Sequence, residues 1–110
     1  MREGDRLVLI PWHVNPFRGD AFEERWRPLA EAVLDYGATS WALVRAREEP
    51  LAFMQLATFS SEEDFERYWN SEEVSEARVE LAGYFQVPLN PEWLRVVDAG
   101  VLTPAPVDAD

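Results

Sequence analysis

The sequence contains no cysteine and one histidine, His13. Without cysteine there is no disulfide, no thiolate nucleophile and no thiolate ligand for a metal. One histidine is too few for the usual zinc site, which takes several His or Cys ligands. The chain also lacks a nucleotide-binding motif, so neither a metal nor another bound cofactor is expected.

Lysine is absent as well, because all ten basic residues are arginine, against 21 acidic residues. Schiff-base chemistry, which needs a lysine amine, is therefore excluded. The formal net charge of −11 argues against binding to a nucleic-acid backbone or an anionic membrane. No apolar run approaches the roughly 18 residues of a membrane span, and the charged N-terminus lacks a signal-peptide core. We expect an acidic cytoplasmic protein.

Aromatic residues are abundant instead: five Trp, six Phe and three Tyr in 110 residues. This length is typical of one domain. Each large ring can bury on the order of 150–250 Å², so aromatic side chains are expected to dominate the core. We expect a single domain over residues 1–98. Residues 99–110 form an acidic, proline-containing tail that we expect to be extended or disordered.

Four segments have the composition of β-strands: residues 6–14, 39–47, 51–59 and 93–98. Pro11 lies in the first of them and cannot donate to a ladder, so we expect it at a sheet edge or a bulge. The second and third segments are separated by the short acidic turn Glu48-Glu49-Pro50. This spacing predicts an antiparallel hairpin.

The first helix is predicted to start at Asp20, an N-cap residue followed three positions later by Glu23. Apolar residues then recur at helical spacing, and Gly37 is a suitable stop. Pro28 disagrees with this pattern, because an interior proline removes one hydrogen bond. We expect a kink there, or a helix that runs regularly only from Pro28.

A second helical region begins after Ser60 and Ser61, with acidic residues in its first turn. Its apolar residues form two sets, which would lie on opposite sides, about 180° apart, if the helix were continuous. The two sets are Phe65, Tyr68 and Trp69, then Val74, Ala77, Leu81 and Phe85. We therefore predict a break near Asn70 and Ser71, and we expect any pocket to lie at this bend, beside Trp69.

The predicted order, strand–helix–strand–strand–helix–strand, is that of the ferredoxin-like βαββαβ unit, an α+β fold with a four-stranded antiparallel sheet. Two helices can cover only one face of such a sheet. The strands nevertheless carry apolar side chains at both odd and even positions, and therefore on both faces. A second copy of the chain is the simplest cover, so we predict a homodimer, a dimeric α+β barrel. The alternative is a monomer with a few exposed apolar side chains.

The chain resembles the antibiotic biosynthesis monooxygenase superfamily over about residues 6–98. The resemblance is carried by the element order and by the segment FERYWNSEEVSEARVELAGYF, with Trp69, Ser71 and Glu72. The resemblance implies a dimeric α+β barrel. Members of the superfamily include cofactor-independent oxygenases of quinol-like aromatics and haem-degrading monooxygenases.

Two departures count against the haem-degrading branch. That branch has a His ligand where this chain has Arg78, and an Asn in the middle of its first strand. Here Leu9, Ile10 and Trp12 occupy that part of the strand, and Asn15 follows at its end.

Candidate site residues come from two classes. Histidine is the side chain best suited to accept a proton at neutral pH, so His13 is a candidate general base for a phenolic substrate. Asn70 is a candidate for orienting that substrate. The candidate ligand pocket is aromatic and consists of Trp12, Trp41, Tyr68 and Trp69. Each residue also has a structural interpretation: an exposed strand-end histidine, a turn asparagine and core aromatics.

Three functions remain open from the sequence. The first is a cofactor-independent, monooxygenase-like enzyme acting on a small aromatic substrate. The second is a non-catalytic protein that binds a small hydrophobic ligand. The third is a structural dimer whose interior is filled by its own side chains. An open cavity between sheet and helices favours the first two, and an interior closed by Trp and Phe argues against them.

Overall fold

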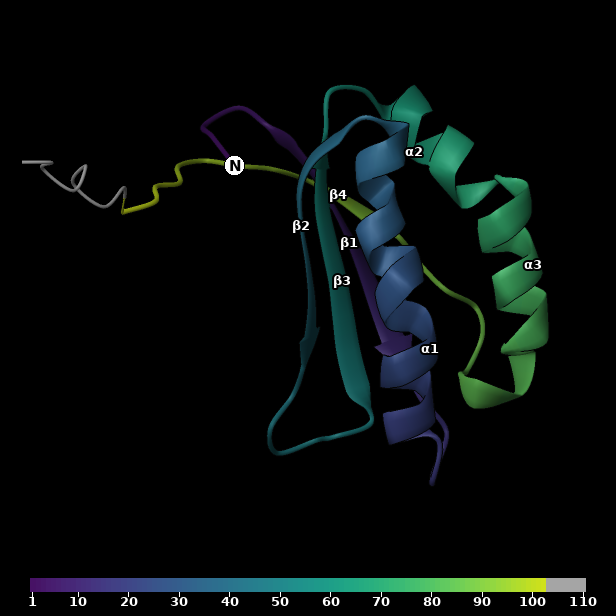
Figure 1. The fold of residues 1–110 in the computed structure, drawn as a ribbon. Coiled ribbons are helices and arrows are strands. Elements are labelled where there is room, and N and C mark those ends of the chain that lie inside the picture. Colours follow the sequence, from purple (N-terminus) through teal and green to yellow (C-terminus); the bar gives the residue numbers. More distant parts are fainter. Residues whose placement is uncertain (103–110) are drawn as a thin grey trace, which may run out of the picture.

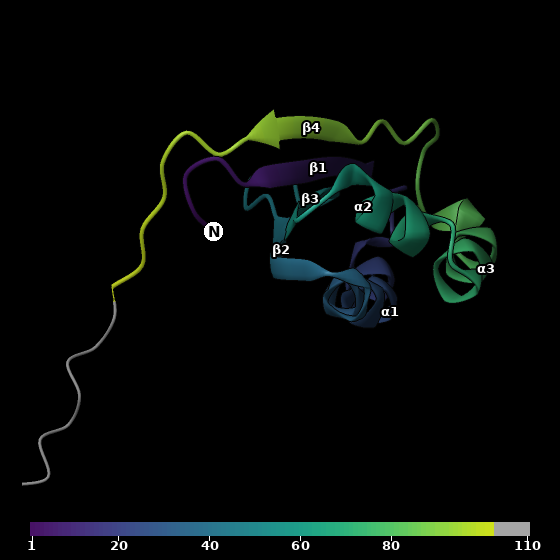
Figure 2. The same ribbon diagram turned by 90° about the horizontal axis from the view of Figure 1, so that it is seen from above.

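The computed structural model describes residues 1–102, in which three α-helices cover one side of a four-stranded antiparallel sheet (Figures 1 and 2). The strand order is β2-β3-β1-β4. The strands are β1 (Arg6–His13), β2 (Ala38–Arg45), β3 (Ala52–Phe59) and β4 (Glu92–Arg95). The helices are α1 (Gly19–Glu31), α2 (Glu62–Trp69) and α3 (Glu72–Glu80), with short 3₁₀ turns at Ala32–Tyr36 and Ala82–Tyr84. The predicted ferredoxin-like order is confirmed, whereas most of the predicted tail, residues 103–110, lies outside the described residues.

Pro11 lies within β1, a central strand. Backbone donors along this chain alternate between two sides: the Val14 nitrogen donates to Leu51 O on the β3 side, and the Asn15 nitrogen donates to Tyr84 O on the other. By this alternation the Pro11 nitrogen faces the β4 side, where β4 has already ended. Pro11 therefore removes no ladder hydrogen bond, because β1 is locally an edge on that side.

The start of α1 differs from the prediction. The helix begins at Gly19 with Arg18 as its N-cap, and Asp20 lies inside its first turn. The Asp20 carboxylate caps no backbone nitrogen and instead accepts a hydrogen bond from Arg45 on β2, at 2.8 Å. The helix also continues through Pro28 and tightens to a 3₁₀ turn only at Ala32, so a start at Pro28 is wrong. Gly37, with a φ of 96°, ends this turn as expected.

The hairpin between β2 and β3 is antiparallel, as predicted, but its connection is longer. Residues 46–51 join the strands in place of the expected three-residue turn. The Ala46 nitrogen donates to Ala52 O at 2.9 Å and closes the loop.

The predicted break in the second helical region is confirmed. α2 ends at Trp69 and α3 begins at Glu72. Ser61 caps α2, where its hydroxyl accepts from the Asp64 nitrogen, and Ser71 caps α3 by accepting from the Val74 nitrogen. Two separate caps let each helix place its own apolar residues, such as Tyr68 and Val74, in the core.

The two faces of the sheet are both apolar. Alternate residues of β1, Val8, Ile10 and Trp12, belong to the core beneath the helices. The opposite face carries the apolar side chains of Leu7, Leu9, Pro11, Ala42, Val44, Met54, Leu56 and Leu94. Val44, Met54 and Leu94 keep 40–45% of their surface exposed. No helix within residues 1–102 covers this face, which we call the open face (Figure 2).

Candidate functional site

The space between sheet and helices is occupied by aromatic rings of the chain itself. The Trp12 ring is packed against four other rings, with centroid distances of 4.6 Å to Trp26, 4.9 Å to Phe85, 5.1 Å to Phe22 and 6.2 Å to Trp69. Trp12, Phe22, Trp26 and Phe85 are all buried. The place where an aromatic substrate was expected is thus filled.

Gln55 is the polar centre of this aromatic core. Its side chain is 1% exposed, and its Oε1 accepts hydrogen bonds from Trp26 Nε1 at 2.9 Å and from Trp12 Nε1 at 3.3 Å. Its Nε2 donates to Tyr68 Oη at 3.0 Å. Sequence analysis missed Gln55, although a lone glutamine in the apolar run LAFMQLATF, on the parity of Phe53, was a usable signal.

Tyr68 extends the network to α1. Its hydroxyl donates to the carbonyl oxygen of Leu29 at 2.7 Å, next to the point where α1 tightens into a 3₁₀ turn. Burial raises the pKa of Tyr68 above its ordinary value of 10.0, and the hydrogen bond from Gln55 opposes this shift. The Tyr68 hydroxyl is therefore protonated and held inside the core, where it both donates and accepts a hydrogen bond.

Trp69 lies at the wall of a surface groove of about 430 Å³. The groove runs between α3 and the segment that leads to β4, and its walls are mostly apolar. It is lined by Trp69, Ser75, Arg78, Val79, Ala82, Phe85, Val87 and Leu89. Arg78 is its cationic group, and its guanidinium carbon lies 4.2 Å from the centre of the Trp69 ring.

His13 lies in a different groove, of about 390 Å³, at the end of β1. The walls come from the β2–β3 connection and from Gln86, and they include Glu49, Pro50 and Leu51. The His13 side chain is exposed, and it is on the opposite parity of β1 from Trp12. The structure thus separates the candidate base from the Trp69 groove.

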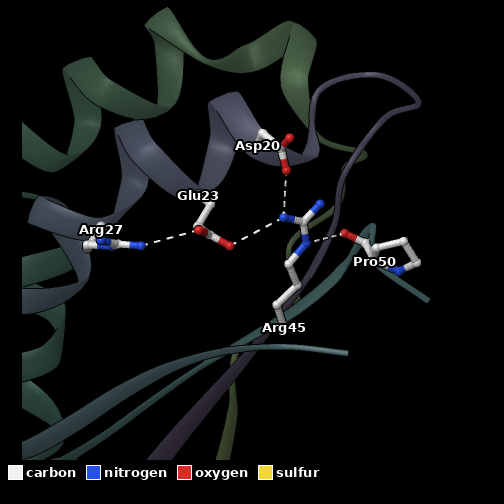
Figure 3. A network of polar contacts seen from close by, with 5 residues as sticks. All are labelled: Asp20, Glu23, Arg27, Arg45 and Pro50. Atoms are coloured by element: carbon white, nitrogen blue, oxygen red, sulfur yellow. Dashed lines mark hydrogen bonds and ion pairs between the residues drawn. The ribbon is translucent and has the colours of Figure 1, made fainter. Parts of the chain in front are cut away.

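Trp41 lines a third and smaller groove of about 220 Å³, together with Leu43, Phe53 and the residues of an ion-pair network (Figure 3). Arg45 Nη1 contacts Asp20 at 2.8 Å and Glu23 at 3.3 Å, and Arg45 Nε donates to Pro50 O. The hydrogen bond to Asp20, followed by that to Glu23, raises the pKa of Arg45. This network fixes the start of α1 against β2.

The predicted site residues therefore divide into separate places. Trp12, Tyr68 and Trp69 come together, with ring centroids 6.2 Å apart for Trp12–Trp69 and 6.4 Å apart for Tyr68–Trp69. Trp41 and His13 line other grooves, and Asn70 is an exposed residue at the C-cap of α2. Of the six, Trp69 is the one that joins the aromatic core to an open surface groove.

Residues 1–102 contain no group of three or more His, Asp or Glu side chains placed to hold a metal ion. None of the helices in this range is long and apolar enough to cross a membrane.

Comparison with known proteins identifies the fold. No family model and no curated protein matches the sequence. A protein from Nitrosomonas europaea, named as a candidate antibiotic biosynthesis monooxygenase, superposes with a TM-score of 0.73 at 14% identity, over 81% of this chain and 95% of its own. A Caulobacter crescentus protein named in the same way superposes with a TM-score of 0.73 at 19% identity, over 87% of this chain and 92% of its own. A protein of unknown function from Bacteroides thetaiotaomicron superposes with a TM-score of 0.71 at 12% identity, over 84% of this chain and 98% of its own.

Identities this low show a shared fold and do not transfer an activity. They support, at the level of the fold, the superfamily resemblance carried by the Trp69–Ser71–Glu72 segment. Function must be argued from the grooves and from the chemistry of their own side chains.

The raised pKa of Tyr68 has a measurable consequence. Above about pH 10, the ordinary pKa of tyrosine, the unfolded chain loses this proton while the folded chain keeps it. The contribution of Tyr68 to the free energy of unfolding is therefore fully present below that pH. It falls as the pH rises toward the folded-state pKa, by at most about 1.4 kcal/mol per pH unit.

We expect Tyr68→Phe to lower the free energy of unfolding at pH 7 by about 1–3 kcal/mol, because it unpairs Gln55 Nε2 and Leu29 O. The same variant should lose less additional stability at alkaline pH than the parent. Urea unfolding at a series of pH values measures both effects, with Tyr84→Phe as the control. An identical alkaline decline in parent and Tyr68→Phe would contradict the assignment.

Proposed function

We propose that this protein is a homodimeric α+β barrel that binds a small, mostly apolar ligand in the groove beside Trp69. The observation that carries the proposal is the contrast between a filled interior and an open groove of about 430 Å³ whose walls are largely apolar. Small-molecule sites are typically concave, apolar and supplied with few polar groups. Here those polar groups are Arg78 and Ser75.

Binding without catalysis fits the placement of the titratable groups. His13 lines the other groove, and the Tyr68 hydroxyl is buried and occupied by Gln55 and Leu29. A general base must come within hydrogen-bond reach of the proton that it removes. Neither side chain meets this requirement for a ligand beside Trp69.

Filling the groove tests the proposal. We expect cinnamamide, a planar neutral aromatic, to shift the backbone amide signals of Val79, Ala82 and Val87 saturably in nitrogen–proton correlation spectra. Ala82→Trp should weaken this binding by about tenfold, because the exposed Ala82 lines the groove and a larger side chain would occupy it.

Glu49→Trp is the matched control, since it fills the groove beside His13 instead. Shifts centred on His13 and Leu51, lost in Glu49→Trp and kept in Ala82→Trp, would move the site to that groove. No saturable shift in either place would overturn the binding function.

A second candidate, a cofactor-independent monooxygenase, is favoured by His13 in its partly apolar groove and by the names of two fold neighbours. In that reaction His13 takes the proton of a quinol hydroxyl and the activated ring reduces O₂. One oxygen atom joins the ring and the other leaves as water, so a hydroxyquinone forms.

Oxygen consumption with naphthoquinol measures this activity. If the protein is an enzyme of this kind, His13→Ala should lower kcat by about a hundredfold, in line with the loss of a general base. A rate in the parent no higher than the uncatalysed reaction, or a rate unchanged in His13→Ala, would remove this candidate.

The dimer is proposed from the open face of the sheet. Leu9, Leu56 and Met54 lie at its centre on adjacent strands, and Glu92, the β4 partner of Leu9, borders this centre on one side. An exposed apolar surface of this kind marks an interface, and a self-complementary two-fold contact is the commonest solution. A second copy would cover the side chains that the helices leave exposed.

We expect the parent to elute as a dimer at micromolar concentration in size-exclusion chromatography with light scattering. Leu56→Glu should produce a monomer, because it places a charge at the centre of the open face. Leu34→Glu, an exposed position on the helical side, is the control and should remain dimeric. A monomeric parent would contradict the proposal.

A further inference from the structure

Two arginines, Arg45 and Arg78, have half-buried side chains, whereas the others are exposed. Arg45 is paired with the carboxylates of Asp20 and Glu23. Arg78 forms no ion pair within residues 1–102, although the chain carries 21 acidic residues and only ten basic ones. A half-buried cation without a counter-charge is therefore the exception in this protein.

The guanidinium of Arg78 is only partly satisfied by its surroundings. Nη2 donates to Trp69 O at 2.6 Å and lies 3.5 Å from Ser75 Oγ. Nε is buried and has no hydrogen-bond partner among the described residues. The loss of water around this group lowers the pKa of Arg78, and no carboxylate contributes to the shift.

These features lie in the wall of the Trp69 groove. The guanidinium carbon lies over the Trp69 ring, and Arg78 is the one charged residue among the described residues that line the groove. A planar guanidinium with a free donor matches a carboxylate, because two N–H groups can meet the two oxygens. The remaining walls, from Val79, Val87 and Leu89, offer apolar surface beside it.

We propose that Arg78 is the anion-recognising residue of this groove and that the ligand is a planar, apolar carboxylic acid. The inference rests on the proposed function, because it assigns a chemical class to the ligand of the same groove. The carboxylate would accept from Arg78 Nη1, since Nη2 is the atom that contacts Trp69 O and Ser75 Oγ, and the apolar body would lie along Val79 and Leu89.

The net charge of −11 sharpens the ligand class. Long-range repulsion disfavours small inorganic anions, which gain nothing from apolar walls. An acid with an apolar body gains from both the guanidinium and the groove. We therefore expect selectivity for aromatic or aliphatic acids over phosphate or sulfate.

The test compares cinnamate with cinnamamide, which have the same planar body and differ in the charge of the head group. In nitrogen–proton correlation spectra of the full chain, cinnamate should bind about tenfold more tightly than cinnamamide. Cinnamate alone should also shift the side-chain Nε–H signal of Arg78, identified by its loss in Arg78→Lys.

Arg78→Met should abolish the preference for cinnamate, so that the variant binds cinnamate and cinnamamide with equal affinity. Arg78→Lys keeps the charge but not the planar fork, so it should recover only part of the preference. Arg67→Met, at an exposed arginine on α2, is the control and should leave the preference intact. If Arg78→Met fails to fold, Arg78→Lys and the Nε–H shift still decide the question.

The outcomes separate the two proposals. Equal affinities for cinnamate and cinnamamide in the parent would overturn the role of Arg78 and leave the groove as a binding site. Absence of groove shifts with both compounds would overturn the binding function itself, and the role of Arg78 with it.

Discussion

The buried amide of Gln55 is the interaction on which the core depends. It joins β3 to Trp12 on β1, to Trp26 on α1 and to Tyr68 on α2, and Tyr68 continues to the Leu29 carbonyl. Each of these groups would cost about 1–3 kcal/mol if buried without a partner, so the network is favourable only when complete. Its geometry holds the indole rings in place, and the rings fill the space between sheet and helices.

Much of the fold could be predicted because its signals are local. Ser61 and Ser71 each cap a helix through the next turn, so the break between α2 and α3 follows from a few adjacent residues. The start of α1 could not be predicted in this way. Asp20 has the chemistry of a cap, but its carboxylate is bound by Arg45, which is 25 residues away in sequence and adjacent only in the folded chain.

The site was harder to predict than the fold for a related reason. The strands are apolar on both parities, so sequence does not say whether Trp12 or His13 faces the helices. The structure puts Trp12 in the core and His13 outside. The indole donors of Trp12 and Trp26 required a buried acceptor, and Gln55 in an apolar strand was the candidate. Arg78 gave no signal, since a missing ion partner is visible only in three dimensions.

The filled core also determines where binding and assembly can occur. Because the aromatic rings around Gln55 fill the interior, the proposed ligand uses a surface groove on the helical side, where Trp69 and Arg78 lie. The open face, with Leu9 and Leu56, is on the other side of the sheet (Figure 2). A partner covering that face would leave the Trp69 groove accessible. The proposed dimer contact and the proposed ligand groove therefore lie on separate surfaces, and a change that disrupts one need not alter the other.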